Sequence, residues 1–193
     1  MRGGGKSGLA LLVAAGCWLA VTTVASLACG YHGSLGNGFS AQHPRSIDVA
    51  LASREAIDKG MIEGLKALPP MLALARVGRA LDELRRDLAD AGADEQPAPS
   101  TLALLLIDAG LWTRYRFGED RLVYEPHAAG PDQTDTVILT SEATLQALLN
   151  GRLSLDDAVS ASLLVVPSDS LHLGTLKILR KSLRPRLRSS NKN

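Results

Sequence analysis

The chain has few aromatic residues, and it lacks the common catalytic signatures. Aromatic side chains make up 4% of its 193 residues, whereas Leu and Ala dominate the apolar set. This composition favours helices or a mixed α/β domain over a β-sandwich. The sequence contains no Gly-x-Ser-x-Gly, Cys-x-x-Cys or His-Glu-x-x-His motif, and the glycines of residues 33–38 have the wrong order for a dinucleotide fingerprint. We therefore expect no enzymatic activity, and we predict no cofactor.

Cysteine is nearly absent too, because the chain has only Cys17 and Cys29. A mature chain that begins at Cys29 has a single thiol, which excludes an internal disulfide. Cys29, His32 and His43 have the chemistry of a soft metal site. However, they lie in a glycine-rich stretch, and a flexible end with exposed histidines is the preferred interpretation. We predict no metal site.

The longest apolar run lies at the start of the chain. Arg2 and Lys6 precede the uncharged, mostly apolar residues 9–28, and the small residues Ser26 and Ala28 stand before Cys29. This order is typical of a secretory leader. We predict a signal peptide over residues 1–28 and an exported protein of the periplasm or cell envelope. Three forms stay open, namely a soluble form, a lipid anchor on Cys29 or Cys17, and an uncleaved membrane anchor.

Charge is distributed unevenly along the rest of the chain. Residues 29–169 hold 12 basic and 20 acidic side chains, whereas the segment from Ser170 to the end holds seven basic residues and no acid. No aromatic residue stands among these basic residues, so we expect no nucleic-acid partner. Four cations fall close to one face of a helix, and they predict contact with an anionic membrane: Lys177, Arg180, Lys181 and Arg184. The alternative is that these charges only keep the chain soluble.

The N-terminal half of the expected domain reads as helical. After a glycine-rich linker over residues 29–45, a short helix is predicted to begin at Ser46 as its N-cap and to end by Gly60. A second helix follows Pro69-Pro70 and carries an apolar stripe from Leu74 to Leu88 at 3-4-3-4 spacing. Core packing is the preferred role of this stripe, and a dimer seam is the alternative.

The second half alternates strands and helices. Residues 111–117 and 121–125 flank a turn and predict a hairpin. Further strands are expected over residues 102–107, 136–140 and 163–166, with helices opened by Ser141, Ser154 and Ser168. We therefore predict an α+β fold, in which a helical N-terminal layer packs on a small mixed β-sheet with C-terminal helices. One domain is expected over residues 46–184, followed by a disordered basic tail over residues 185–193.

Residues 135–166 resemble the C-terminal part of sterol-carrier-protein domains. Those domains run strand, helix, Gly-Arg/Lys-Leu, an acidic helix with a central Ala, strand and final helix. Gly151-Arg152-Leu153 and Asp156-Asp157-Ala158 fall in that order. The resemblance implies a curved sheet whose covering helices enclose an apolar tunnel for a lipid tail. Separately, Cys29-Gly-Tyr-His32 is similar to the start of small uncharacterised exported bacterial proteins, which carry no known chemistry.

These observations lead to two hypotheses of function. The first is a non-enzymatic exported protein that binds an apolar or amphipathic small molecule. Its candidate lining residues are Leu106, Trp112, Tyr115, Val123, Ile138, Leu145 and Leu148. The second is an interaction or scaffold protein of the cell envelope, with a filled core and no ligand. Trp112 lies on the polar side of its strand, so it lines a cavity under the first hypothesis and a covered face under the second. The sequence does not identify a protein partner.

Overall fold

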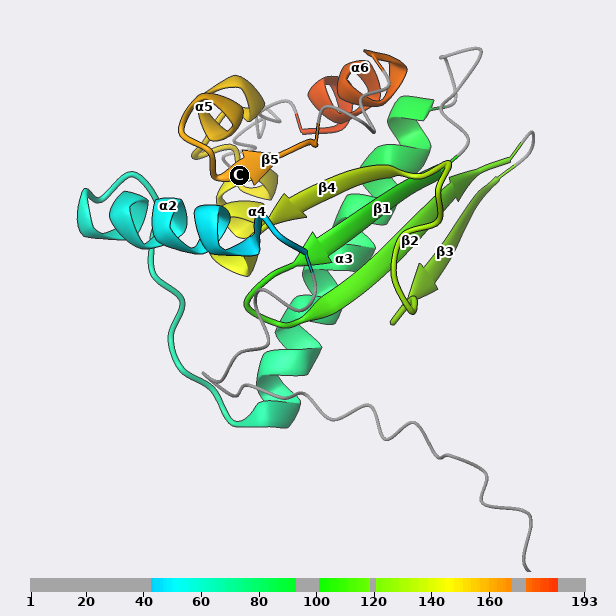
Figure 1. Ribbon diagram of the computed structural model, residues 1–193. Helices are drawn as coiled ribbons and strands as arrows, with labels where there is room; N and C mark the ends of the chain where they lie inside the picture. The colour runs from blue at the N-terminus through cyan, green and yellow to red at the C-terminus, as the bar shows by residue number, and fades with distance from the viewer. Residues whose placement is uncertain (1–42, 93–100, 119–120, 168–172, 184–193) are drawn as a thin grey trace, which may run out of the picture. The chain divides into compact units, whose positions relative to one another are not determined.

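The computed structural model describes residues 43–92, 101–118, 121–167 and 173–183, and contacts divide the chain into residues 1–30 and 31–193. Every described element belongs to the second unit (Figure 1). The helices are α2 (Ser46–Asp58), α3 (Pro70–Gly92), α4 (Glu142–Leu149), α5 (Leu155–Ser160) and α6 (Leu173–Ser182). The strands are β1 (Thr101–Leu106), β2 (Leu111–Phe117), β3 (Leu122–Pro126), β4 (Thr136–Thr140) and β5 (Leu164–Val165). The expected α+β class is confirmed.

The five strands form one mixed sheet in the order β3-β2-β1-β4-β5. The segment from β1 to β3 is an antiparallel meander, in which the predicted hairpin is the β2–β3 pair. The chain then crosses back, so that β4 pairs with β1 in parallel and β5 pairs with β4 antiparallel. The edges are β5, which is two residues long, and β3, which ends at Pro126. Because β1 and β4 are parallel, their carboxyl ends lie at the same end of the sheet.

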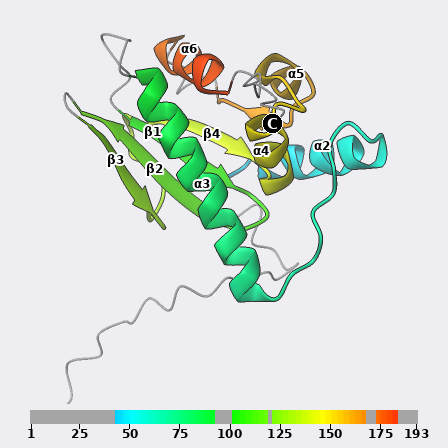
Figure 2. The same cartoon turned by 180° about the vertical axis from the view of Figure 1, so that it is seen from behind.

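The first face of the sheet is covered by α3, α4 and α6. Figure 2 shows α3 lying over the sheet, and α4 and α6 contact it. The predicted stripe on α3 is the core side of this helix, since Val77, Leu81, Leu84 and Leu88 are all buried. They join one cluster with alternate residues of the strands, among them Leu104, Tyr115 and Ile138. Packing on the sheet rather than a dimer seam therefore accounts for the buried side of the stripe.

The second face holds a smaller apolar cluster, made by the other alternate strand residues. Leu105, Trp112 and Leu139 belong to it, together with Val49 from α2. This double coverage explains why β1 is apolar at nearly every position rather than alternating. The two N-terminal helices differ in what they cover, because α3 packs in the first cluster, whereas α2 contributes Ala56 to the first cluster and Val49 to the second.

Local sequence signals predicted most helix starts correctly. The Ser141 hydroxyl accepts from the Thr144 N–H and the Ser154 hydroxyl from the Asp157 N–H, as expected of N-caps. Ser46 is an exception, because Arg45 is the N-cap of α2 and Ser46 is its first helical residue. The Ser46 hydroxyl is buried without a hydrogen-bond partner among the described residues.

Candidate functional site

None of the seven predicted lining residues borders the two hollows described below. Five of them are buried in the cluster of the first face: Leu106, Tyr115, Ile138, Leu145 and Leu148. Trp112 is buried in the cluster of the second face, as expected of a covered side chain, and Val123 is exposed. The Tyr115 hydroxyl donates to the Leu81 carbonyl at 3.1 Å, which ties β2 to α3. Six of the seven side chains are therefore packed in the two apolar clusters, and the hollows described next are lined by other residues.

Two adjoining hollows of about 260 and 280 Å³ lie beside α4. They share Leu65 and Ala143, so together they form a groove between α2, the 60–65 segment and α4. The first hollow is lined mainly by apolar side chains, among them Ile57 and Ile107. The second is lined on the α4 side by residues at 3-1-3 spacing: Ala143, Gln146, Ala147 and Asn150. The groove has room because α4 presents alanines here and turns its leucines to the core.

A polar cluster lines one end of the groove, where the parallel strands end. Ser141 follows β4, and its hydroxyl lies 3.0 Å from the Ser53 hydroxyl of α2 and 2.9 Å from that of Thr144. Asp108 follows β1, and both of its carboxylate oxygens lie 3.0 Å from the Glu142 N–H, which donates to them. The first turn of α4 is therefore held by side chains from both strand ends, with a contact to α2.

Two ion pairs connect the surrounding elements to α4. Arg76 of α3 donates from Nε and Nη2 to the two carboxylate oxygens of Glu142, at 2.5 and 3.1 Å. At the other end of the groove, Arg152 pairs with Glu63 at 2.5 Å, and this contact lowers the pKa of Glu63. Arg152 belongs to the Gly151-Arg152-Leu153 motif. Gly151 has a φ of 68°, a conformation that favours glycine after a helix, and Leu153 is buried.

The carboxyl group of Asp108 is poorly solvated. The residue is exposed as a whole, but its carboxylate is directed at the start of α4, and desolvation there raises its pKa. A carboxyl group with a raised pKa in the folded state stabilises the fold below the ordinary aspartate pKa of about 3.9. This contribution is lost as the pH rises through the folded-state pKa. At neutral pH the ionised Asp108 carboxylate is therefore less favourable for folding than a neutral side chain at this position would be.

We predict that Asp108→Asn stabilises the protein at neutral pH. The asparagine oxygen can still accept from the Glu142 N–H, while the desolvated charge is removed. The urea midpoint of the variant should exceed that of the wild type at neutral pH, and the difference should shrink at a pH well below 3.9, the ordinary aspartate value. A variant that is less stable than the wild type at neutral pH would contradict this account of the carboxylate.

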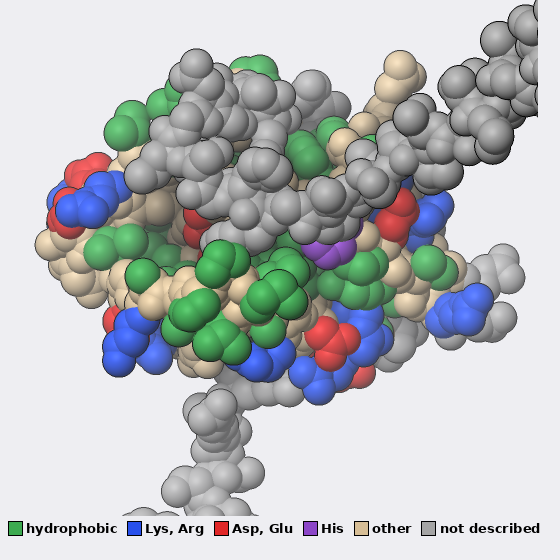
Figure 3. Space-filling model, turned by 90° about the horizontal axis from the view of Figure 1, so that it is seen from below, with side chains coloured by type: hydrophobic (Ala, Val, Ile, Leu, Met, Phe, Trp, Pro, Cys, Tyr) green, Lys and Arg blue, Asp and Glu red, His purple; other side chains and the backbone are tan. Residues whose placement is uncertain are grey.

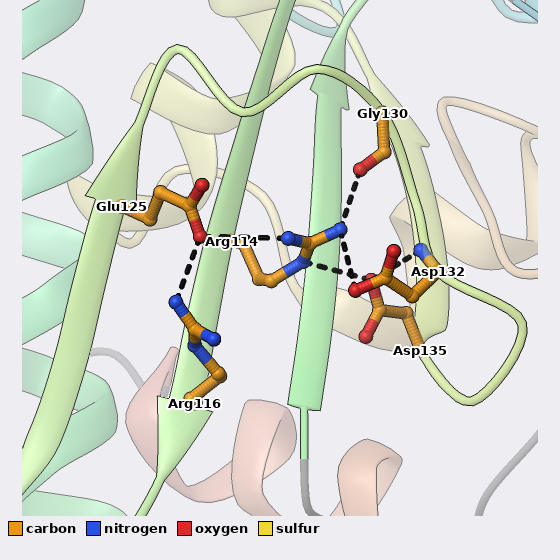
Figure 4. Close-up of polar contacts among 6 residues, drawn as sticks. All are labelled: Arg114, Arg116, Glu125, Gly130, Asp132 and Asp135. Atoms are coloured by element: carbon orange, nitrogen blue, oxygen red, sulfur yellow. Dashed lines mark hydrogen bonds and ion pairs between the residues drawn. The ribbon is translucent and has the colours of Figure 1, made fainter.

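A second polar cluster lies on the second face of the sheet, around Arg114 (Figure 4). Its guanidinium is 3.0 Å from both Asp135 and Asp132, 3.4 Å from Glu125 and 2.7 Å from the Gly130 carbonyl. Asp135 is buried, and it also accepts from the Asp132 N–H at 2.8 Å. Arg114 therefore fixes the segment that connects β3 to β4. These contacts are satisfied within the protein, so we assign the cluster a structural role.

The cations predicted to contact a membrane are partly engaged within the fold. Lys177 is exposed, whereas Arg180 pairs with Asp156 at 2.6 Å. The Lys181 ammonium group donates to the Ala91 carbonyl, at the end of α3, at 3.2 Å. Arg184 and the candidate lipidation residue Cys29 lie outside the described residues.

The described residues offer neither a metal site nor a membrane-spanning helix, and the chain has no match among known proteins. Within the described part of the chain, no three His, Cys, Asp or Glu side chains come together as a metal site. Among the helices described here, none is both long and apolar enough to cross a membrane. The chain matches no protein-family model, and no match was found among curated proteins or solved structures. The groove and its surroundings are therefore the features of this protein that bear on function.

Sequence reasoning missed the groove and the polar cluster at its end. Ser141 was identified as a cap, but Ser53, Arg76 and Asp108 were not connected with it. The available signal was an acid two residues after β1 and a capping serine directly after β4. This signal becomes informative only when the two strands are known to be parallel neighbours.

Proposed function

We propose that this protein binds a small apolar or amphipathic molecule in the groove between α2 and α4, without catalysis. The observation that carries the proposal is the pair of adjoining hollows with alanines on one wall and hydroxyl, carboxylate and charged groups near the ends. Ligand pockets combine mostly apolar walls with a few polar groups in this way. Each hollow is slightly smaller than the roughly 300–1,000 Å³ of pockets for drug-sized ligands. A short single-chain amphiphile suits this size.

Two features of the sequence support the same proposal. The order β4, α4, Gly151-Arg152-Leu153, α5, β5, α6 is the order that the resemblance to sterol-carrier-protein domains implies. The basic, apolar and small-residue pattern of residues 1–28 favours export, and a carrier of apolar molecules would act in the periplasm or envelope. We place the ligand in this groove and not in the internal tunnel that the resemblance implies.

A scaffold protein of the cell envelope without a ligand is the second candidate. The observation that favours it is the packed core, in which six of the seven expected lining residues are buried, five in one cluster and Trp112 in the other. Under this hypothesis the groove is a shallow surface feature. The two candidates differ in whether filling the groove changes the binding of an apolar probe.

We predict that Ala143→Leu weakens probe binding at least tenfold. Ala143 borders both hollows, so the larger side chain occupies space in each. The probe is N-phenyl-1-naphthylamine, titrated by fluorescence, with decanoate as the competitor. A tenfold loss corresponds to about 1.4 kcal/mol, less than the contribution of one well-buried apolar side chain.

The matched control is Ala89→Leu, which adds the same bulk at a half-buried position of α3 that lines neither hollow. It should bind the probe like the wild type. Urea unfolding of both variants verifies that each is folded, because overpacking costs about 1–3 kcal/mol. Unchanged binding by folded Ala143→Leu would exclude the groove, and a wild type that binds neither compound would favour the scaffold.

A further inference from the structure

An exposed apolar surface lies where the 60–69 segment meets α3. We call residues 68–72 the apolar corner: Leu68, Pro69, Pro70, Met71 and Leu72. The side chains of Leu68, Met71 and Leu72 are 40%, 76% and 56% exposed. Figure 3 looks at this end of the molecule, where hydrophobic side chains gather between charged ones. A contiguous group of large exposed apolar residues is unusual on a soluble protein and marks an interaction surface.

The apolar corner is held in a fixed conformation. The Pro69 carbonyl accepts from the N–H groups of Leu72 and Ala73, at 2.9 and 3.0 Å, which starts α3. Arg76 donates to the Lys66 carbonyl at 2.9 Å while it pairs with Glu142 of α4. The two prolines restrict the backbone further. A surface ordered in advance loses less conformational entropy when it binds, so this corner is suited to docking.

The charged residues nearest to the apolar corner along the chain are basic on both sides, although Arg76 is already paired with Glu142. Residues 64–81 contain Lys66, Arg76 and Arg79 and no acidic residue, although residues 29–169 as a whole carry 12 basic and 20 acidic side chains. Lys66 and Arg79 are exposed on either side of the corner along the chain. The exposed apolar side chains therefore lie in a locally basic stretch of an acidic domain. This combination is complementary to the surface of an anionic bilayer.

We propose that the apolar corner docks on an anionic lipid bilayer, with Leu68, Met71 and Leu72 in the interfacial layer and Lys66 and Arg79 at the phosphates. A second copy of the chain fits less well, because pairing two corners would bring like charges together. This membrane contact differs from the one that the sequence predicts for the cations of α6. Lys181 of α6 lies beside Ala91, about 30 Å along α3 from the corner at 1.5 Å per residue. A bilayer met by the corner leaves α6 away from its surface.

The test uses the full chain with one acrylodan label at a time. Cys17→Ser and Cys29→Ser remove the natural thiols, and Met71→Cys, Leu51→Cys or Lys177→Cys introduces the label. Residues 51 and 177 are exposed controls, on α2 and α6. Each protein is mixed with vesicles of phosphatidylcholine, with or without phosphatidylglycerol. Because all variants keep residues 1–30, any anchoring by that segment is common to them, and the emission reports which surface meets the lipid.

We expect a blue shift and quenching by doxyl-labelled lipid at residue 71 on phosphatidylglycerol vesicles, with much smaller changes at residues 51 and 177. Lys66→Glu with Arg79→Glu should remove most of the shift. Emission at residue 71 that does not respond to vesicles, or that responds no more than at residue 177, would overturn the proposal. A shift without vesicles that grows with protein concentration would also overturn it, in favour of a second copy.

Discussion

Replacing Arg114 by methionine is expected to lower the free energy of unfolding by about 3–5 kcal/mol, the usual cost of removing one partner of a buried ion pair. The change removes the guanidinium that contacts Asp132, Asp135 and the Gly130 carbonyl. Asp135 is only 3% exposed, so its carboxylate would stay buried without its cation. Urea unfolding of the wild type and the variant measures the difference.

Arg116→Met is the matched control for this prediction. Arg116 lies two residues further along β2 and also pairs with Glu125, but about half of its side chain is exposed. Exposed pairs contribute about 0–1 kcal/mol, so this variant should stay within that range. Equal losses from the two substitutions would show that burial of Asp135 is not what makes Arg114 important.

Arg76→Met is expected to cost a similar amount, about 3–5 kcal/mol. It leaves the Glu142 carboxylate, 4% exposed, without its bidentate partner at the start of α4. It also removes the hydrogen bond to the Lys66 carbonyl that holds the segment before α3. The loss of stability should therefore be larger than the loss from replacing a surface arginine of the same helix.

A double variant isolates the pair from other effects of the substitution. Adding Glu142→Gln to Arg76→Met removes the stranded charge, so the double variant should recover part of the lost stability. Arg86→Met, whose side chain is exposed and 3.8 Å from Asp82, is the control on α3. A double variant less stable than Arg76→Met alone would show that the main role of Glu142 is independent of Arg76.

Local elements of the fold were predictable, because the residues that determine them are close in sequence. The spacing from Leu74 to Leu88 is enough to define the core side of α3, and a capping serine is enough to start α4. The β2–β3 hairpin needs only a turn between two short strands. In each of these three elements, the interaction that determines the local structure joins residues only a few positions apart.

The arrangement of the elements was less predictable, for a physical reason. The β1–β4 pairing joins residues 34 positions apart, and β4 is buried on both faces, so its pattern does not indicate its neighbours. The position of α2 depends on Val49 reaching the second face of the sheet. The candidate groove depends on the β1–β4 pairing and on the position of α2. Asp108 and Ser53 approach the start of α4 only after the strands pair and α2 docks.

The two edges of the sheet have a consequence for the behaviour of the protein at high concentration. The outer strand β5 offers only Leu164 and Val165, and β3 carries Glu125 and ends in a proline, which has no N–H to donate. Short edges and edges that contain charge or proline are poor templates for strands from another molecule. Crowding of this domain should therefore not lead to growth of intermolecular β-sheet, even though its interior strands are rich in leucine, isoleucine and valine.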